Sequence, residues 1–390
     1  MKKTFLLFTI FLVSNYAYSQ IQTLENQVLQ KVCEKLKSIN SIRFDQTREL
    51  NYSSENYNSF SDWNCYYTKD SKENLLGIKF QIQNPDYLEF FNGTEYFTLN
   101  NQDKTYEVQN EIDIKNINAK SYFYNSILTL SNILPILIKD ELAQKSVSDT
   151  LIDRKKFKNI KINLGRRTFQ NSGKGFIPMK SERDFIYTIL IDAKTFLPKE
   201  ILQTNSLNSD FTKVSFKNYK LNPEEPEENS WFYSTYKNDY KPINKKTLKQ
   251  LALGEKAPNF ILDLFNKSET IELEQQKGKV VLLDFWIKNC GACIESVEFL
   301  NKLYEKYKDK NFELLSINSY DGIENINFFY NKYGLKYPVL TNGKSILEKY
   351  GVNAFPTIFI LDKEGKIVYS DILSDDRNKI ESIISSALEK

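Results

Sequence analysis

The spacing of hydrophobic residues changes its period after about residue 220, and this change predicts two domains. Residues 40–220 contain short runs rich in β-branched and aromatic residues, separated by polar turn signals. Such runs are typical of antiparallel strands joined by hairpins. Helical spacing interrupts them at residues 23–39 and 126–138. We therefore predict a β-rich, α+β domain over residues 20–221.

After residue 250 the pattern alternates between strand and helix. Residues 279–286, "KVVLLDFW", form a nearly continuous apolar run that is typical of a buried parallel strand. Helical spacing follows at once, and a hairpin and a final helix close the chain. This order predicts an α/β domain over residues 251–390. Residues 222–230 are acidic and proline-rich, and the residues that follow are polar without a clear period, so we predict a linker over residues 222–250.

The N-terminus has the pattern of a secretory signal peptide. Two lysines precede an apolar run at residues 5–13, and Ala17 and Ser19 are small residues at positions −3 and −1 of a cut after Ser19. The run is shorter than the roughly 20 residues that span a bilayer. We expect residues 1–19 to be removed and the mature protein to be exported, in soluble form, to the periplasm or cell envelope.

The composition excludes several classes of function. Lys plus Arg number 53 and Asp plus Glu number 50. This balance gives no reason to expect nucleic acid or an anionic membrane surface as a partner. Histidine is absent, which removes the commonest general base and most zinc chemistry. We expect neither a cofactor nor a metal.

Candidate chemistry concentrates at the stretch "WIKNCGACIE", residues 286–295, where the predicted buried strand gives way to a helix. Cys290 and Cys293 stand three positions apart, so both sulfurs lie on one side of the first turn, close enough for a disulfide. Unpaired backbone N–H groups at the helix start favour the thiolate of Cys290, the attacking species in disulfide exchange. Cys293 is then placed to resolve the mixed disulfide.

Two other interpretations of this pair carry less weight. A zinc site needs four ligands, and only Cys33 and Cys65, in the other predicted domain, could add sulfur. A purely structural disulfide across so short a gap closes almost no loop, so it stabilises little. A redox pair is therefore the favoured interpretation. Cys33 and Cys65 could also bond to each other, but the sequence does not decide how four cysteines pair.

Two segments of the second domain resemble the TlpA/ResA-like branch of the thioredoxin superfamily. One begins "GEKAPNFILDL" at residue 254 and runs through the dithiol, and the other is "VNAFPTIFILDKEGKIV" at residues 352–368. The resemblance covers about residues 252–390. It implies a thioredoxin fold and a thiol–disulfide oxidoreductase, most simply a reductase of disulfides in envelope proteins. A membrane-embedded thiol donor would supply its electrons.

The family's roles fall on matching positions of this sequence. The resemblance implies that Cys290 attacks, that Cys293 resolves, and that Asp284 is a buried carboxylate relaying the proton of the resolving thiol. An acid in an apolar strand should have a raised pKa, which suits that role. The resemblance also implies a substrate-facing surface at Trp286, Phe355 and Pro356, with Pro356 as the family's cis-proline.

Three positions depart from related patterns. Ala292 stands where thioredoxins usually have proline, and Asn289 replaces the usual tryptophan before the first cysteine. Such changes alter the reduction potential. A disulfide oxidase or isomerase, or a binding protein using the fold as a scaffold, therefore stays an alternative. Peroxidase activity is disfavoured because Ile287 replaces the Thr or Ser that peroxiredoxins need.

The first domain weakly resembles LolA/LolB-like half-barrels. The resemblance rests on the opening helix, "IRFDQTREL" at residues 42–50, the long run of strands, and "IDAKTFLPKEI" at residues 191–201. It implies a concave face for a lipid or lipoprotein. A spacer or a docking surface for the redox domain is at least an equal alternative, since a fold alone does not define a function.

Overall fold

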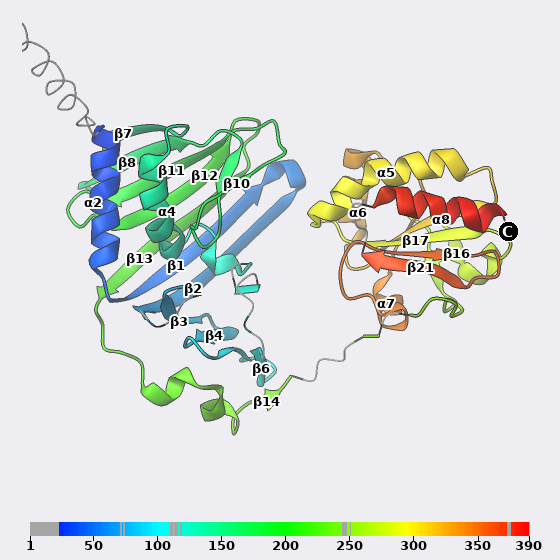
Figure 1. The fold of residues 1–390 in the computed structure, drawn as a ribbon, viewed down its shortest axis with the longest axis horizontal. Coiled ribbons are helices and arrows are strands. Elements are labelled where there is room, and N and C mark those ends of the chain that lie inside the picture. The colour runs from blue at the N-terminus through cyan, green and yellow to red at the C-terminus, as the bar shows by residue number, and fades with distance from the viewer. Residues whose placement is uncertain are drawn as a thin grey trace, which may run out of the picture. The chain divides into compact units, whose positions relative to one another are not determined.

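The computed structural model describes residues 23–389 except 71, 73–74, 110–111, 113–115, 118, 244–247, 250 and 373–375. The predicted signal peptide, residues 1–19, lies outside this part. The chain divides into two compact units at residues 244 and 245 (Figure 1). Among the described residues, no helix is long and apolar enough to cross a membrane.

The N-terminal unit is built on one twelve-stranded sheet, so the β-rich prediction is confirmed. The strands follow the order β14-β6-β5-β4-β3-β2-β1-β13-β12-β11-β8-β7, and all neighbours are antiparallel except β14 and β6. Their bounds are β1 (Ser41–Tyr52), β2 (Tyr57–Lys69), β3 (Ile78–Gln83), β4 (Tyr87–Phe91), β5 (Tyr96–Asn100), β6 (Thr105–Gln109), β7 (Gln144–Ile152), β8 (Lys155–Asn163), β11 (Phe185–Asp192), β12 (Pro198–Asn205), β13 (Phe211–Leu221) and β14 (Lys241–Pro242). In the described part the edge strands β14 and β7 do not pair, so no closed barrel is seen.

Helices α2 (Leu24–Ser38) and α4 (Ile127–Lys139) cover one face of this sheet (Figure 1). Each has a side-chain N-cap: Thr23 Oγ1 accepts the N–H of Asn26 at 3.3 Å, and Ser126 Oγ accepts that of Thr129 at 3.1 Å. The apolar stripe of each helix packs into the main core of the unit. A small ribbon, β9 (Arg167–Phe169) with β10 (Phe176–Pro178), and the 3₁₀ turns η1 (Ser53–Glu55) and η2 (Ser121–Phe123) complete this region.

Part of the second face of the sheet, over β4 and β5, is covered by part of the predicted linker. Phe91 faces the main core, so the preceding Phe90 points to the opposite face, where it forms an aromatic cluster with Phe97. Tyr236 packs on both rings, with centroids 5.5 and 5.9 Å away. Tyr236 ends the 3₁₀ turn η4 (Tyr233–Tyr236), which follows the turn η3 (Glu228–Trp231) and precedes β14.

The predicted linker over residues 222–250 is therefore too long. Residues 228–242 pack on the N-terminal unit, and the boundary lies near residue 244. The aromatic residues within this polar stretch carry the packing, although its charge and proline content are typical of a linker.

The C-terminal unit has a five-stranded sheet in the order β19-β18-β17-β20-β21. β17 pairs in parallel with β18 and antiparallel with β20, while β19 is parallel to β18 and β21 antiparallel to β20. The elements are β15 (Ile261–Asp263), β16 (Thr270–Glu272), η5 (Leu273–Gln276), β17 (Val280–Trp286), α5 (Gly291–Tyr307), β18 (Phe312–Asn318), α6 (Ile323–Tyr333), β19 (Val339–Leu340), α7 (Lys344–Tyr350), β20 (Thr357–Leu361), β21 (Ile367–Ile372) and α8 (Arg377–Glu389). This is the predicted α/β layout.

Strand β17 lies in the middle of the sheet, and all seven of its residues are buried. Val280, Leu282 and Trp286 pack with α5, α6 and α8 on one face, and the alternating residues pack with α7 on the other. The predicted buried strand is confirmed. Because α5 begins just beyond the carboxyl end of β17, the centre of the sheet holds the start of α5 in place.

Candidate active site

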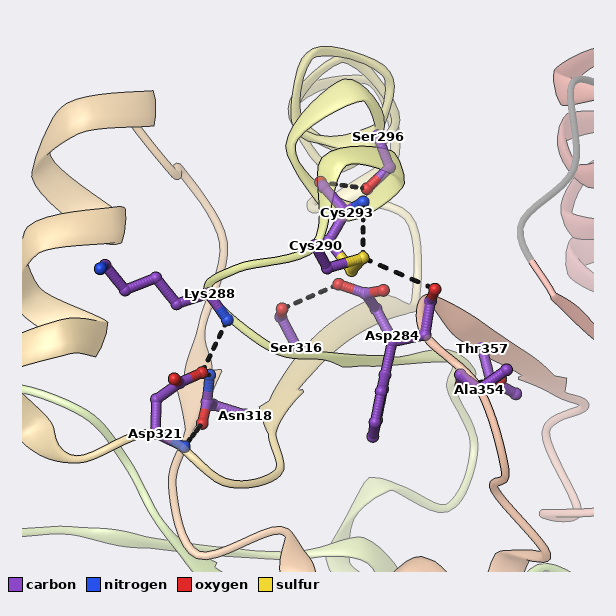
Figure 2. The surroundings of a disulfide bond; sticks show 11 residues. Asp284, Lys288, Cys290, Cys293, Ser296, Ser316, Asn318, Asp321, Ala354 and Thr357 are labelled. Carbon is purple, nitrogen blue, oxygen red and sulfur yellow. Dashed lines mark hydrogen bonds between the residues drawn. A yellow bond between two sulfur atoms is a disulfide. The ribbon is translucent and has the colours of Figure 1, made fainter. Parts of the chain in front are cut away.

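The two cysteines lie at the start of α5, as predicted. Cys290 is the N-cap residue, and its Sγ accepts the backbone N–H of Cys293 at 3.1 Å. The two residues are joined by a disulfide, with their Cα atoms 5.2 Å apart (Figure 2). Cys290 is half-buried, whereas Cys293 is only 2% exposed. A molecule approaching from solvent therefore meets the sulfur of Cys290 first.

The surroundings of Cys290 suit a thiolate. When the disulfide is reduced, the N–H of Cys293 can donate to a negatively charged Cys290 sulfur, and the unpaired N–H groups of the first helical turn add to that stabilisation. The Sγ of Cys290 also lies 3.5 Å from the carbonyl oxygen of Phe355. In the disulfide this is only a contact, but the thiol could donate a hydrogen bond there.

Asp284 is buried beneath the dithiol. Its side chain shares the face of β17 with Leu282 and Trp286, is 2% exposed, and points toward the disulfide in Figure 2. Ser316 Oγ donates to Asp284 Oδ2 at 2.9 Å, and Oδ1 has no hydrogen-bond partner among the described residues. Burial raises the pKa of Asp284 to about 7, and the Ser316 hydroxyl only partly opposes this rise. The predicted raised pKa is confirmed.

The bond between Phe355 and Pro356 is cis, as the resemblance implied. It lies immediately before β20, whose Thr357 pairs with Phe285 of β17. Phe355 is half-buried and Pro356 is buried. Since the Phe355 carbonyl touches the Cys290 sulfur, this loop and the dithiol form one site.

The prediction that Trp286 faces a substrate is wrong. Its side chain is 2% exposed and packs on Phe329 of α6, with ring centroids 4.3 Å apart. Alternation along β17 places residues 284 and 286 on the same face, beneath α5 and α6. Trp286 therefore belongs to the core that supports the dithiol.

Sequence reasoning missed a polar clamp on the loop before Cys290. The carboxylate Oδ2 of Asp321 accepts the backbone N–H of Lys288 at 2.7 Å and the side-chain amide of Asn318 at 2.9 Å. The N–H of Asp321 donates in turn to Asn318 Oδ1 at 2.8 Å. Figure 2 shows this clamp beside the disulfide. Its sequence signal is a group of polar residues after β18, at the carboxyl end of the neighbouring parallel strand.

The other two cysteines lie apart from this site. Cys33 and Cys65 are unbonded and buried in the main core of the N-terminal unit. Burial raises the pKa of the Cys65 thiol, which makes its thiolate scarce. Among the described residues, no group of three or more Cys, Asp or Glu side chains could hold a metal ion.

Comparisons with known proteins identify relatives of the C-terminal unit. Residues 252–388 match the Redoxin family, a range that includes the dithiol, Asp284 and the cis-proline. The thiol-disulfide oxidoreductase ResA of Bacillus thuringiensis (strain Al Hakam) is 37% identical over 137 residues, which are 35% of this chain and 78% of that protein. ResA of Bacillus subtilis (strain 168) is 34% identical over 116 residues, 30% of this chain and 64% of that protein.

Among solved structures, the thioredoxin domain of a thiol-disulfide oxidoreductase from Bacteroides vulgatus is 30% identical. The match covers 35% of this chain and 99% of that one, with a TM-score of 0.33. The Redoxin match begins at residue 252, within the C-terminal unit. The resemblance of the N-terminal unit to LolA/LolB-like half-barrels stays a prediction.

Proposed function

The chain belongs to the family of the thiol-disulfide oxidoreductase ResA, and from this premise we propose that it reduces disulfides in proteins outside the cytoplasm. The observation that supports this most is the unequal burial of the two sulfurs. Cys290 is half-buried at the helix start with an N–H directed at its sulfur, and Cys293 is buried behind it. This asymmetry gives the two cysteines different roles without any histidine.

In the proposed reaction, the Cys290 thiolate attacks one sulfur of a substrate disulfide. The substrate S–S bond breaks, one substrate sulfur leaves as a thiolate that takes up a proton, and a mixed disulfide forms. Cys293 then attacks the Cys290 sulfur and releases the second substrate thiol. Two electrons have passed from the dithiol to the substrate, and the Cys290–Cys293 disulfide remains.

Asp284 would act in the second step as a proton acceptor. The Cys293 thiol must lose its proton before it attacks, and it is buried away from bulk water. A carboxylate whose pKa is about 7 can accept that proton near neutral pH and release it later. Phe355 and Pro356 would border the substrate at the Cys290 sulfur.

The proposed partners follow from this stoichiometry. Each substrate disulfide leaves the dithiol oxidised, so a dithiol donor must return two electrons per turnover. We propose oxidised envelope proteins as substrates and a membrane-embedded thiol protein as the donor, after export by the predicted signal peptide. A lipid or lipoprotein at the N-terminal unit rests on its fold resemblance alone.

Reduction of insulin tests this function. The mature protein, supplied with dithiothreitol, should precipitate insulin B chain much faster than dithiothreitol alone, and Cys290→Ser should lower the rate to that background. Cys33→Ala removes a cysteine from the other unit and should keep the rate. A wild-type rate equal to background would contradict the proposal.

A further inference from the structure

The loop between β18 and α6 presents an aromatic side chain beside the dithiol. Tyr320 is 59% exposed, and its ring stands edge-on to the ring of Phe355, with centroids 6.0 Å apart. The carbonyl of Phe355 lies 3.5 Å from the Cys290 sulfur. Phe355 therefore contacts the reactive sulfur through its carbonyl oxygen and Tyr320 through its ring.

Exposed apolar side chains are concentrated at this loop. Among the described residues of the C-terminal unit, four large hydrophobic side chains are exposed: Leu253, Ile261, Tyr320 and Ile323. Tyr320 and Ile323 lie three positions apart, at the start of α6. Single exposed hydrophobic residues are ordinary, but an exposed aromatic ring that contacts the loop at a reactive sulfur is a surface that a partner can cover.

A rigid base supports the loop. Asp321, the residue after Tyr320, is held by its hydrogen bonds with Lys288 and Asn318. The ammonium of Lys344 lies 5.8 Å from the Tyr320 ring and adds a cation–π contact. Because these contacts already hold the loop in one conformation, binding of a substrate on Tyr320 costs little conformational entropy of the protein.

We propose that Phe355 and Tyr320 form a docking surface for the polypeptide segment that flanks the substrate cysteine. Tyr320 selects segments with an aromatic or aliphatic side chain close to that cysteine. This inference rests on the proposed function and adds the class of substrate to it.

The occupant follows from the reaction itself. The substrate sulfur must come within about 2 Å of the Cys290 sulfur, and an extended chain advances about 3.3 Å per residue. A residue one to three positions from the substrate cysteine therefore reaches the rings of Phe355 and Tyr320. An apolar side chain there loses contact with water, and the nearby Lys344 disfavours a positively charged one.

The alternative role for Tyr320 is to hold Phe355 in place. In that case its loss would slow every disulfide alike, because the carbonyl beside the Cys290 sulfur would shift. A docking role affects only substrates whose flanking residue reaches Tyr320. Comparison among substrates therefore separates the two roles.

The experiment uses the full mature chain and three disulfides. Two are disulfide-linked peptides that differ only in having Phe or Ser two residues after the cysteine, and the third is oxidised glutathione. Tyr320→Ser should lower kcat/KM for the Phe peptide by about tenfold, the loss expected for one aromatic contact, and change the other two by less than about twofold. Tyr320→Leu should retain most of the preference for Phe.

Ile261→Ser is the matched control, since Ile261 is exposed to a similar extent but lies on β15. It should leave all three rates unchanged. Equal loss on all three substrates, or no loss on the Phe peptide in Tyr320→Ser, would overturn the docking role. A wild-type protein that reduces none of the three would instead refute the proposed function, so the two failures are distinguishable.

Discussion

The hydroxyl of Ser316 donates a hydrogen bond of 2.9 Å to the Asp284 carboxylate across the paired strands β17 and β18. One hydrogen bond to a fully buried carboxylate is a weak substitute for water, which explains why burial dominates and the pKa rises to about 7. The carboxyl group therefore changes charge within the pH range in which thiols become reactive.

Asp284 should make the stability of the protein depend on pH. Its folded pKa is about 7 against a usual value of 3.8, so the folded state binds more protons between these values. Stability should therefore fall as pH rises from about 4 to 7 and level off above, by on the order of 4 kcal/mol in total. Asp284→Asn should remove this slope, as measured by urea unfolding at several pH values.

The control for this prediction is Asp309→Asn, because Asp309 is an exposed carboxylate of the same unit. It should keep the wild-type dependence of stability on pH. If that dependence survives in Asp284→Asn, another group titrates.

In turnover, the same Asp284→Asn variant should slow release of reduced substrate near neutral pH while leaving the first attack by Cys290 nearly unchanged.

Cys293→Ser should accumulate a mixed disulfide with protein substrates. Its Cys290 is half-buried and reachable, but no thiol remains to resolve the intermediate. Cys290→Ser should accumulate almost none, because the remaining sulfur of Cys293 is buried. Non-reducing electrophoresis and mass spectrometry measure both yields. Equal yields from the two variants would refute the assigned order of attack.

The parts of the site that depend on local sequence were predictable. Two cysteines at i and i+3 after an apolar strand define their own geometry, and the apolar neighbours of Asp284 imply its burial. Strand alternation also predicts that the Trp286 side chain is buried, because it lies two positions from the buried Asp284 and therefore shares its face of the strand.

Contacts that depend on the pairing of strands distant in the sequence could not be predicted. Ser316 reaches Asp284 only because β17 and β18 pair in this register, and Asp321 reaches Lys288 for the same reason. No local pattern gives that register. In the N-terminal unit, the polar residues around Tyr236 are typical of a linker, yet its ring lies on a sheet face that only the folded chain creates.

Tyr236→Ala should destabilise the N-terminal unit by about 2 kcal/mol, because the Phe90–Phe97 pair loses part of its cover. Thermal unfolding followed by near-ultraviolet circular dichroism measures the change. Phe60→Ala is the matched control, since Phe60 is 67% exposed, and it should change stability by less than about 0.5 kcal/mol. Similar effects from both variants would contradict the packing of residues 228–242 on the sheet.

The C-terminal unit should fold and act alone when it begins at Lys245. It has its own sheet and two apolar cores, and every residue assigned to the chemistry lies within it. The first residue of the fragment affects its stability. Asn353 donates a hydrogen bond of 3.0 Å to the carbonyl of Leu248, and Leu251 packs against one of the cores.

A fragment over residues 245–390 should therefore reduce oxidised glutathione as fast as the whole protein. A fragment that begins at Ala252 should unfold at a lower temperature, because it lacks both contacts. Circular dichroism and the glutathione assay on the two fragments test these statements. If the longer fragment is insoluble or inactive, the two units share a core or a site, and the N-terminal unit then contributes to the chemistry itself.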